Sequence, residues 1–472
     1  MDAGDKMRGS TRNATLYFLS SISAKVIGFF YFLLIAHWLD LGEFGLISFA
    51  ATIAVLSDTA ADLGMGRYIL REVARDPGAA GRLAGVFLPL KLLISLMIYG
   101  VAVLFLPPQF QGEQAFAVLS VYALWLAASG VAILLEQILH ARNRFGFASA
   151  ARFVPGVVQM LAGGAVGLAG GGVVAFAAAA TVSSLSYICV ILLGLSRLNV
   201  RIDVTGAAAR FLPALYSALP FAAVTTLLLL SLKVEFLVFV QVADTEAVGI
   251  YSMAARLYEA ALTAPFAYSA VMTARMVQAA HQGRDAFGAL YLRTIRMAAN
   301  VGVATALIGA VITQPFVTTV LPGDYAASAP LLLMMLFGYP FMTLHLVNVS
   351  AMLSLSAQLR PAGLMLGLIL LQLVIAKVLL IFWGMTGVAI ATAVFALVSF
   401  IASTVAVRLW LSDRGCLSAL APAAVACVAS IAVHLALDLQ PTRVHVVALL
   451  VGLTAMVATT AMLALSKGGM ST

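Results

Sequence analysis

Long apolar segments alternate with short polar ones along most of the chain. Runs of about 20 apolar residues, the length with which a helix crosses a hydrocarbon core of about 30 Å, recur from end to end. The pattern predicts fourteen membrane-spanning helices, at 15–38, 44–64, 83–106, 115–138, 150–169, 172–195, 212–241, 247–273, 294–320, 327–353, 362–383, 385–408, 416–437 and 444–465. Several connections between them are only a few residues long, such as 40–43 and 167–172. The spans are therefore expected to pack as helical hairpins with little chain outside the membrane.

The composition agrees with this reading. Of the 472 residues, 63% are hydrophobic and only 10% are charged, whereas ordinary soluble domains are about half apolar and about a quarter charged. A soluble core could not bury so much apolar surface. We therefore predict an all-α integral membrane protein.

The net charge of +8 at first suggests a nucleic-acid partner, but the placement of the charges indicates otherwise. If the N-terminus is cytoplasmic, the cytoplasmic segments hold twenty-one Lys and Arg residues, and the opposite side holds Arg443 alone. Such an asymmetry is typical of the positive-inside rule. We predict that both termini are cytoplasmic, that the basic surface faces lipid headgroups, and that no nucleic acid is bound.

Motifs for catalysis or cofactor binding are missing from the sequence. There is no G-x-x-x-x-G-K-[ST] for nucleotide hydrolysis and no H-E-x-x-H for a metal. The cysteines Cys189, Cys416 and Cys427 are not spaced as metal ligands. We predict that the protein is not an enzyme and has no cofactor or metal site.

Weak internal similarity suggests a duplication. "LPPQF" at 106–110 resembles "LPGDY" at 321–325, and "GVVAFAAAATVSS" from Gly172 resembles "GVAIATAVFALVS" from Gly387, both at an offset of 215. "EFGLISFAA" at 43–51 resembles "AVGIYSMAA" at 247–255 at an offset of 204. The order of these matches predicts two pseudo-symmetric six-helix lobes around a central cleft, at 1–205 and 206–411, with two further spans within 412–472. Parallel repeats of this kind are typical of transporters that work by alternating access.

Apart from Arg152, Arg296 and Arg408, which are assigned to the cytoplasmic surface at span ends, ten Asp, Glu, Lys and Arg residues lie inside the predicted spans: Lys25, Asp58, Asp62, Lys91, Glu136, Lys233, Glu235, Arg256, Glu259 and Lys377. Because a charge in lipid is costly, such residues are expected to face a cleft or a partner. Glu136 and Lys377 are near span ends and are expected to reach water along the helix surface. For Lys91, the position in the span favours neither access to water nor a partner inside the protein. His345 and His434 are expected to be packed, hydrogen-bonded residues.

Helical spacing suggests roles for the rest. In a continuous helix Lys233 and Glu235 would point about 200° apart and would not pair. One of them would then meet Arg256, which shares a face with Glu259, while the other faces the cleft. Both a buried ion network and a cationic patch for an anionic substrate fit this arrangement.

Asp58 and Asp62 share a face of the second span. Two readings of this pair remain open. The carboxylates could form a structural cluster with Arg67 and Arg71, or they could form a site that couples transport to Na+ or H+.

The stretch "DLGEFGLISFAATIAVLSDTAADLGMGRYILREVAR" at 40–75 resembles the second span of bacterial polysaccharide transporters. These are the Wzx-type flippases for lipid-linked oligosaccharide repeat units, within the multidrug/oligosaccharidyl-lipid/polysaccharide exporter superfamily. "LKVEFLVFVQVADTEAVGIYSMAARLYEA" is similar to the family's segment for spans 7 and 8, and 321–336 and 384–395 continue the similarity.

The resemblance implies a flippase of the bacterial inner membrane. It would move an undecaprenyl-pyrophosphate-linked oligosaccharide from the cytoplasmic to the outer leaflet for surface polysaccharide synthesis. Lys25, Lys233 and Arg256 would bind the substrate, and Asp58, Asp62, Glu235 and Glu259 would be coupling or structural carboxylates. Its partners would be membrane lipids, a polysaccharide polymerase and glycosyltransferases. The alternatives are a multidrug exporter of the same superfamily, driven by Na+ or H+, and a membrane-embedded glycosyltransferase, polymerase or ligase.

Overall fold

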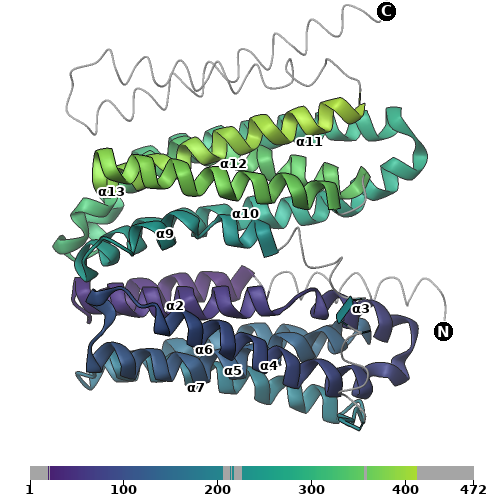
Figure 1. Cartoon of the computed structure of the whole chain (residues 1–472), viewed down its shortest axis with the longest axis horizontal. Helices are drawn as coiled ribbons and strands as arrows, with labels where there is room; N and C mark the ends of the chain where they lie inside the picture. Colours follow the sequence, from purple (N-terminus) through teal and green to yellow (C-terminus); the bar gives the residue numbers. More distant parts are fainter. Residues whose placement is uncertain are drawn as a thin grey trace, which may run out of the picture. The chain divides into compact units, whose positions relative to one another are not determined.

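The computed structural model describes residue 20, residues 22–205, 213, 215–216, 226–355 and 359–411. Within these residues the regular structure is entirely helical (Figure 1). Eight of the described helices are long and apolar enough to cross a membrane, and a shorter apolar helix covers Ile22–Ile35. The prediction of an all-helical membrane protein is confirmed. The predicted spans at 416–437 and 444–465, and with them His434, lie outside the described residues.

The described residues up to Lys233, together with Val240–Ser252, form a first compact unit. Its helices after Ile22–Ile35 are α2 (Leu41–Ala61), α3 (Met65–Arg75), α4 (Ala80–Leu104), α5 (Glu113–Ala141), α6 (Phe145–Leu168) and α7 (Val173–Ser196), with the short 3₁₀ helices η1 (Pro77–Ala79) and η2 (Pro108–Phe110). The helix α5 contacts α2, α3, α4, α6 and α7. It is therefore the central helix of this unit.

A second compact unit contains Val234–Phe239 and the described residues from Met253 onward. It holds α9 (Val234–Phe239), most of α10 (Thr245–Gln282), α11 (Arg284–Val320), the 3₁₀ helix η3 (Gly323–Ala327), α12 (Ser328–Leu355) and α13 (Leu359–Leu411). The helix α12 packs between α11 and α13, and α9 packs on α13.

The long element α13 consists of two helices that fold back on each other at Gly384. This glycine has φ 56° and ψ −138°, which is not helical. A Cβ placed on Gly387 would lie 2.0 Å from the carbonyl oxygen of Leu379. Residues eight apart in a straight helix would be about 12 Å apart along the axis, so the chain reverses here. The result agrees with the separate spans predicted at 362–383 and 385–408.

Two predicted spans are broken. The span predicted at 44–64 ends as α2 at Ala61, and Leu63 (φ 42°) and Gly64 (φ 79°) turn the chain through the left-handed region into α3. In the described part of the span predicted at 212–241, a turn at 232–233 precedes α9, and the amide of Lys233 donates to the carbonyl of Leu230 at 2.9 Å. One continuous helix was therefore the wrong assumption for Lys233 and Glu235, and the expected 200° separation does not apply.

The repeated stretches have the same local structure. Asp40 caps α2 by accepting from the amide of Glu43 at 2.7 Å, and Asp244 accepts from the amide of Ala247, at the start of α10, at 2.7 Å. These two pairs are related by the offset of 204. The stretches related by the offset of 215 form η2 and η3, and both bury an aromatic residue, Phe110 and Tyr325.

Candidate functional site

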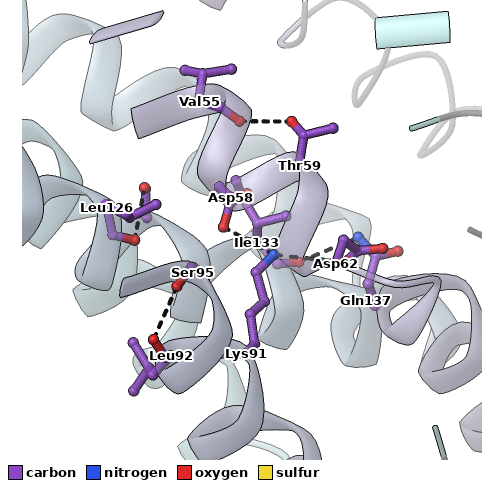
Figure 2. Close-up of polar contacts among 11 residues, drawn as sticks. Val55, Asp58, Thr59, Asp62, Lys91, Leu92, Ser95, Leu126, Ile133 and Gln137 are labelled. Atoms are coloured by element: carbon purple, nitrogen blue, oxygen red, sulfur yellow. Dashed lines mark hydrogen bonds and ion pairs between the residues drawn. The ribbon is translucent and has the colours of Figure 1, made fainter. Parts of the chain in front are cut away.

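Asp58, Asp62 and Lys91 come together inside the first unit and are called the α2–α4 cluster below. Figure 2 shows the two carboxylates of α2 and the ammonium of α4 pointing toward one another. The Nζ of Lys91 lies 3.1 Å from Oδ1 of Asp58 and 3.6 Å from Oδ1 of Asp62. The exposed fraction of the side chain is 2% for Lys91, 12% for Asp58 and 31% for Asp62. The cluster is an ion pair network that opens toward one end of α2.

The local sequence explains this geometry. Two residues four apart share one face of a helix, so Asp58 and Asp62 both face α4. On the α5 side the space is provided by Gly130, where a Cβ would lie 2.7 Å from Oδ1 of Asp58. Asp62 is also the residue at which α2 ends, directly before the left-handed Leu63.

The carboxylates also have a partner that the sequence did not indicate. Arg71 forms an ion pair with Glu72 at 2.9 Å on the exposed side of α3. The charge of Asp62 does act on Arg67, which is partly buried. This partner is Lys91, which forms ion pairs with both carboxylates. Only the tertiary contact between α2 and α4 reveals it.

Glu136, Arg152 and Tyr187 form a second network, the α5–α6 cluster. Arg152 donates twice to Glu136, from Nε at 2.9 Å and from Nη2 at 2.5 Å, and the hydroxyl of Tyr187 donates to Oε2 at 2.7 Å. The side chain of Glu136 is 0% exposed. The expectation that Glu136 reaches water is therefore wrong. Its charge is compensated inside the unit because the hairpin of α5 and α6 brings Arg152, assigned to the cytoplasmic surface, against it.

The two clusters lie against different faces of α5. Gly130 and Gln137 contact the side of α2 and α3, whereas Glu136 contacts α6 and α7. The first unit thus keeps its buried charges in two places separated by its central helix.

The predicted substrate-binding cations occupy positions of different exposure. Lys25 is exposed, on the helix Ile22–Ile35, which packs on α6 where Gly163 adjoins the ring of Tyr31. Lys233 is half-buried at the turn before α9, and Arg256 is half-buried on α10. Each of the three takes part in an interaction, and their role as substrate ligands stays a prediction.

The two remaining predicted carboxylates lie in the second unit. Glu235 is buried on α9 and acts electrostatically on the buried hydroxyl of Tyr258. Glu259 is half-buried on α10. Their roles as coupling or structural carboxylates also stay predictions.

A neutral polar network in the second unit was not predicted as such. The amide of Asn348 donates to Ser403 at 3.0 Å and to Thr404 at 2.9 Å, and Tyr291 donates to its carbonyl oxygen at 2.8 Å. Nδ1 of His345 lies 3.1 Å from Oγ of Ser403. The prediction that His345 is a packed, hydrogen-bonded residue is confirmed. The polar residues of α12 and α13 gave a signal in the sequence, since an apolar span has few reasons to contain them.

Among the described residues, no group of three or more His, Cys, Asp and Glu side chains is arranged to hold a metal ion. The polar contacts described above are ion pairs and hydrogen bonds between helices of the described part.

The sequence profile of the family described as "Polysaccharide biosynthesis protein" matches residues 10–279, more than half of the chain. The chain belongs to this family. The family is one of transporters, which confirms the Wzx-type resemblance and excludes the alternative of a glycosyltransferase, polymerase or ligase. No curated protein sequence matches the chain significantly.

Solved structures share the fold. The structure "Lipid II flippase MurJ, inward closed conformation" matches with a TM-score of 0.70 at 12% identity, over 95% of this chain and 98% of that one. An inward-facing multidrug resistance MATE family transporter of the MOP superfamily matches with a TM-score of 0.64 at 17% identity, over 84% of this chain and 94% of that one. A MATE transporter of Vibrio cholerae matches with a TM-score of 0.59 at 15% identity, over 86% and 98%. The protein is therefore a multi-pass membrane transporter of polysaccharide biosynthesis with the fold of this superfamily.

Proposed function

We propose that the protein is a flippase that moves an undecaprenyl-pyrophosphate-linked oligosaccharide from the cytoplasmic to the outer leaflet of the bacterial inner membrane. The observation that carries the proposal is the family match over 10–279. The fold shared with a lipid II flippase over 95% of the chain supports it. Polymerase and glycosyltransferases of surface polysaccharide synthesis would be its functional partners.

In this proposal the two lobes, 1–205 and 206–411, alternately open a central cleft to each side, with both termini in the cytoplasm. Lys25, Lys233 and Arg256 supply positive charge for the pyrophosphate and for acidic sugars. The positive charge of these side chains would attract an anionic headgroup. Lys residues act on phosphate as point charges, whereas Arg offers a planar fork that can bind two oxygens.

A deletion strain complemented with the protein tests the proposal. Surface polysaccharide should return with the wild-type protein, and each of Lys25→Ala, Lys233→Ala and Arg256→Ala should lower it at least severalfold at equal protein abundance. Lys377→Ala is the matched control, because Lys377 is an exposed lysine on α13 and should leave polysaccharide unchanged. Wild-type levels in all three variants would refute the role of these cations.

Failure of the wild-type protein to complement would refute the flippase itself. A direct measurement is the accessibility of the lipid-linked oligosaccharide in spheroplasts to an added sugar-binding lectin. The deletion strain should accumulate lipid-linked sugar that the lectin does not reach, and the complemented strain should expose it.

A second candidate is a multidrug exporter of the same superfamily driven by Na+ or H+. The observation that favours it is the fold shared with the MATE transporters. It predicts that the deletion strain becomes sensitive to cationic drugs while its surface glycans remain intact.

A further inference from the structure

The α2–α4 cluster has no charged counterpart in the second copy of the repeat. At the offset of 204, which relates the capped starts of α2 and α10, the positions of its two carboxylates correspond to Leu262 and Phe266. The position of its lysine corresponds to Ile295 at the offset of 204 and to Ala306 at the offset of 215. All four counterparts are apolar, and Leu262 and Ile295 are buried.

The apolar residues in the second copy argue against a purely structural role for the charges of the α2–α4 cluster. A buried ion pair is often no more stabilising than apolar side chains of similar size in the same place. The second copy shows that α10 and α11 form with apolar residues at these positions. The corresponding helices of the second copy form without these charges, and an ionisable residue inside a membrane span is by default a candidate functional residue.

Side-chain exposure in the α2–α4 cluster increases stepwise toward the end of α2. The exposed side-chain fraction rises from 2% at Lys91 to 12% at Asp58 and 31% at Asp62. The charged groups that face these carboxylates are Lys91 from α4 and, next to Asp62, Arg67 from α3. From α5 the described contact is Gly130, which carries no charge. Water at Asp62 is thus separated from Asp58 only by the ammonium group of Lys91, which pairs with both carboxylates.

We propose that the α2–α4 cluster is a proton-exchange site of the transporter, a proposal that rests on the transport function given above. The carboxylate of Asp58 takes a proton from water by way of Asp62 and forms an O–H bond. Lys91 stays an ammonium, leaves the neutralised Asp58 and pairs with Asp62 alone. The charge of the cluster rises by one and falls again when the proton is released.

The position of Asp62 gives this exchange a structural consequence. Asp62 ends α2, and the two following residues are in the left-handed region. When the ammonium loses Asp58 and keeps Asp62, the ion pair holds α4 to α2 only at the residue next to this break, about one turn beyond Asp58. Protonation thereby changes how α4 is held against the end of α2.

Infrared difference spectroscopy of the full protein in liposomes tests the proton site directly. Acidification should produce the C=O stretch of a protonated carboxyl in the wild-type protein. The band should disappear in Asp58→Asn and persist in the control variant Glu136→Gln, which alters the other buried carboxylate. A band unchanged in Asp58→Asn would overturn the proposal, as would a signal that follows Na+ at constant pH instead of pH.

The double variant Asp58→Asn with Lys91→Met tests whether the cluster is only structural. It removes both charges, as the second copy does, so it should reach wild-type abundance, whereas Lys91→Met alone leaves the two carboxylates without their ammonium and should accumulate less. We expect the double variant to give less than a tenth of the wild-type surface polysaccharide. Polysaccharide near the wild-type level in the double variant would show that the cluster merely holds α2 to α4.

These results separate the two proposals. If the wild-type protein does not restore polysaccharide to the deletion strain, the flippase proposal fails. If it does, but the double variant restores it equally well or the carboxyl band does not depend on Asp58, only the proton-exchange proposal fails.

Discussion

Gly45 and Gly249 bring the starts of α2 and α10 into reciprocal backbone contact. A Cβ on Gly45 would lie 2.1 Å from the carbonyl oxygen of Thr245, and a Cβ on Gly249 would lie 2.2 Å from that of Leu41. Thr245 and Gly249 follow Leu41 and Gly45 by the same 204 residues. Each copy of the repeat thus places its glycine on the equivalent carbonyl of the other, around a local two-fold axis.

Substitution of either glycine by alanine should destabilise the protein. Because a methyl group has no space at these distances, the helices must move apart, and we expect Gly45→Ala and Gly249→Ala each to lower the free energy of unfolding by about 1–3 kcal/mol. Thermal unfolding of the purified protein in detergent measures the effect. The control is Gly288→Ala on α11, where no atom lies within 4 Å of the new Cβ. Equal unfolding midpoints for all three variants would contradict the tight contact.

Loss of Arg152 should be more damaging than loss of an exposed arginine. In Arg152→Met the fully buried carboxylate of Glu136 loses both donors from its ion pair, and we expect a loss of about 3–5 kcal/mol of stability. Arg197→Met, at an exposed position after α7, should have little effect. The double variant Glu136→Gln with Arg152→Met should recover much of the loss because no buried charge remains. A double variant less stable than Arg152→Met would show that the ion pair is not the source of the effect.

The reversal in α13 should depend on Gly384. Its φ and ψ lie in a region that is nearly closed to other residues, so Gly384→Ala should cost about 1–3 kcal/mol. Gly367→Ala in the same element meets no atom within 4 Å and should be neutral or stabilise the helix by about 0.5–1 kcal/mol. Protease resistance or thermal unfolding distinguishes the two variants. The assignment of a turn at this residue fails if both behave alike.

The polar network of the second unit should be sensitive at Asn348. Asn348→Ala removes the acceptor described for the hydroxyl of Tyr291 and a donor to Ser403 and Thr404, and loss of hydrogen bonds to buried polar groups costs about 1–3 kcal/mol. Thr392→Ala removes a hydroxyl whose described hydrogen bond is to its own helix and should cost ~0.5 kcal/mol or less. Denaturant unfolding compares the two. Similar losses would indicate that the network adds little to stability.

The sequence predicted membrane helices well because hydropathy depends on local composition. It predicted the reversal at Gly384 for the same reason, since a glycine lies between two apolar runs. The sequence "DLG" at 62–64 contains a glycine that could have indicated the break at the end of α2, but the apolar run at 44–64 led to the prediction of one continuous span. The turn at Lys233 contains neither glycine nor proline, so nothing in the local sequence distinguishes it from the interior of a helix.

The candidate site was harder to predict because ion pairs between helices depend on tertiary packing. Asp58 and Asp62 could be selected from their helical spacing, but Lys91 could be assigned to them only once α4 was placed against α2. Glu136 was judged by its sequence distance from Arg142, whereas its partner Arg152 reaches it through the hairpin of α5 and α6. Charges inside spans can thus be identified as important from sequence, and their partners cannot.

The single-residue reversal at Gly384 also bears on how the chain is made. The two helices of α13 meet without a polar loop that could stay at the membrane surface while the first of them inserts. If only the first half spanned the bilayer, the apolar second half would be left exposed to water. We therefore expect the two halves of α13 to enter the membrane together, as one helical hairpin, during biosynthesis.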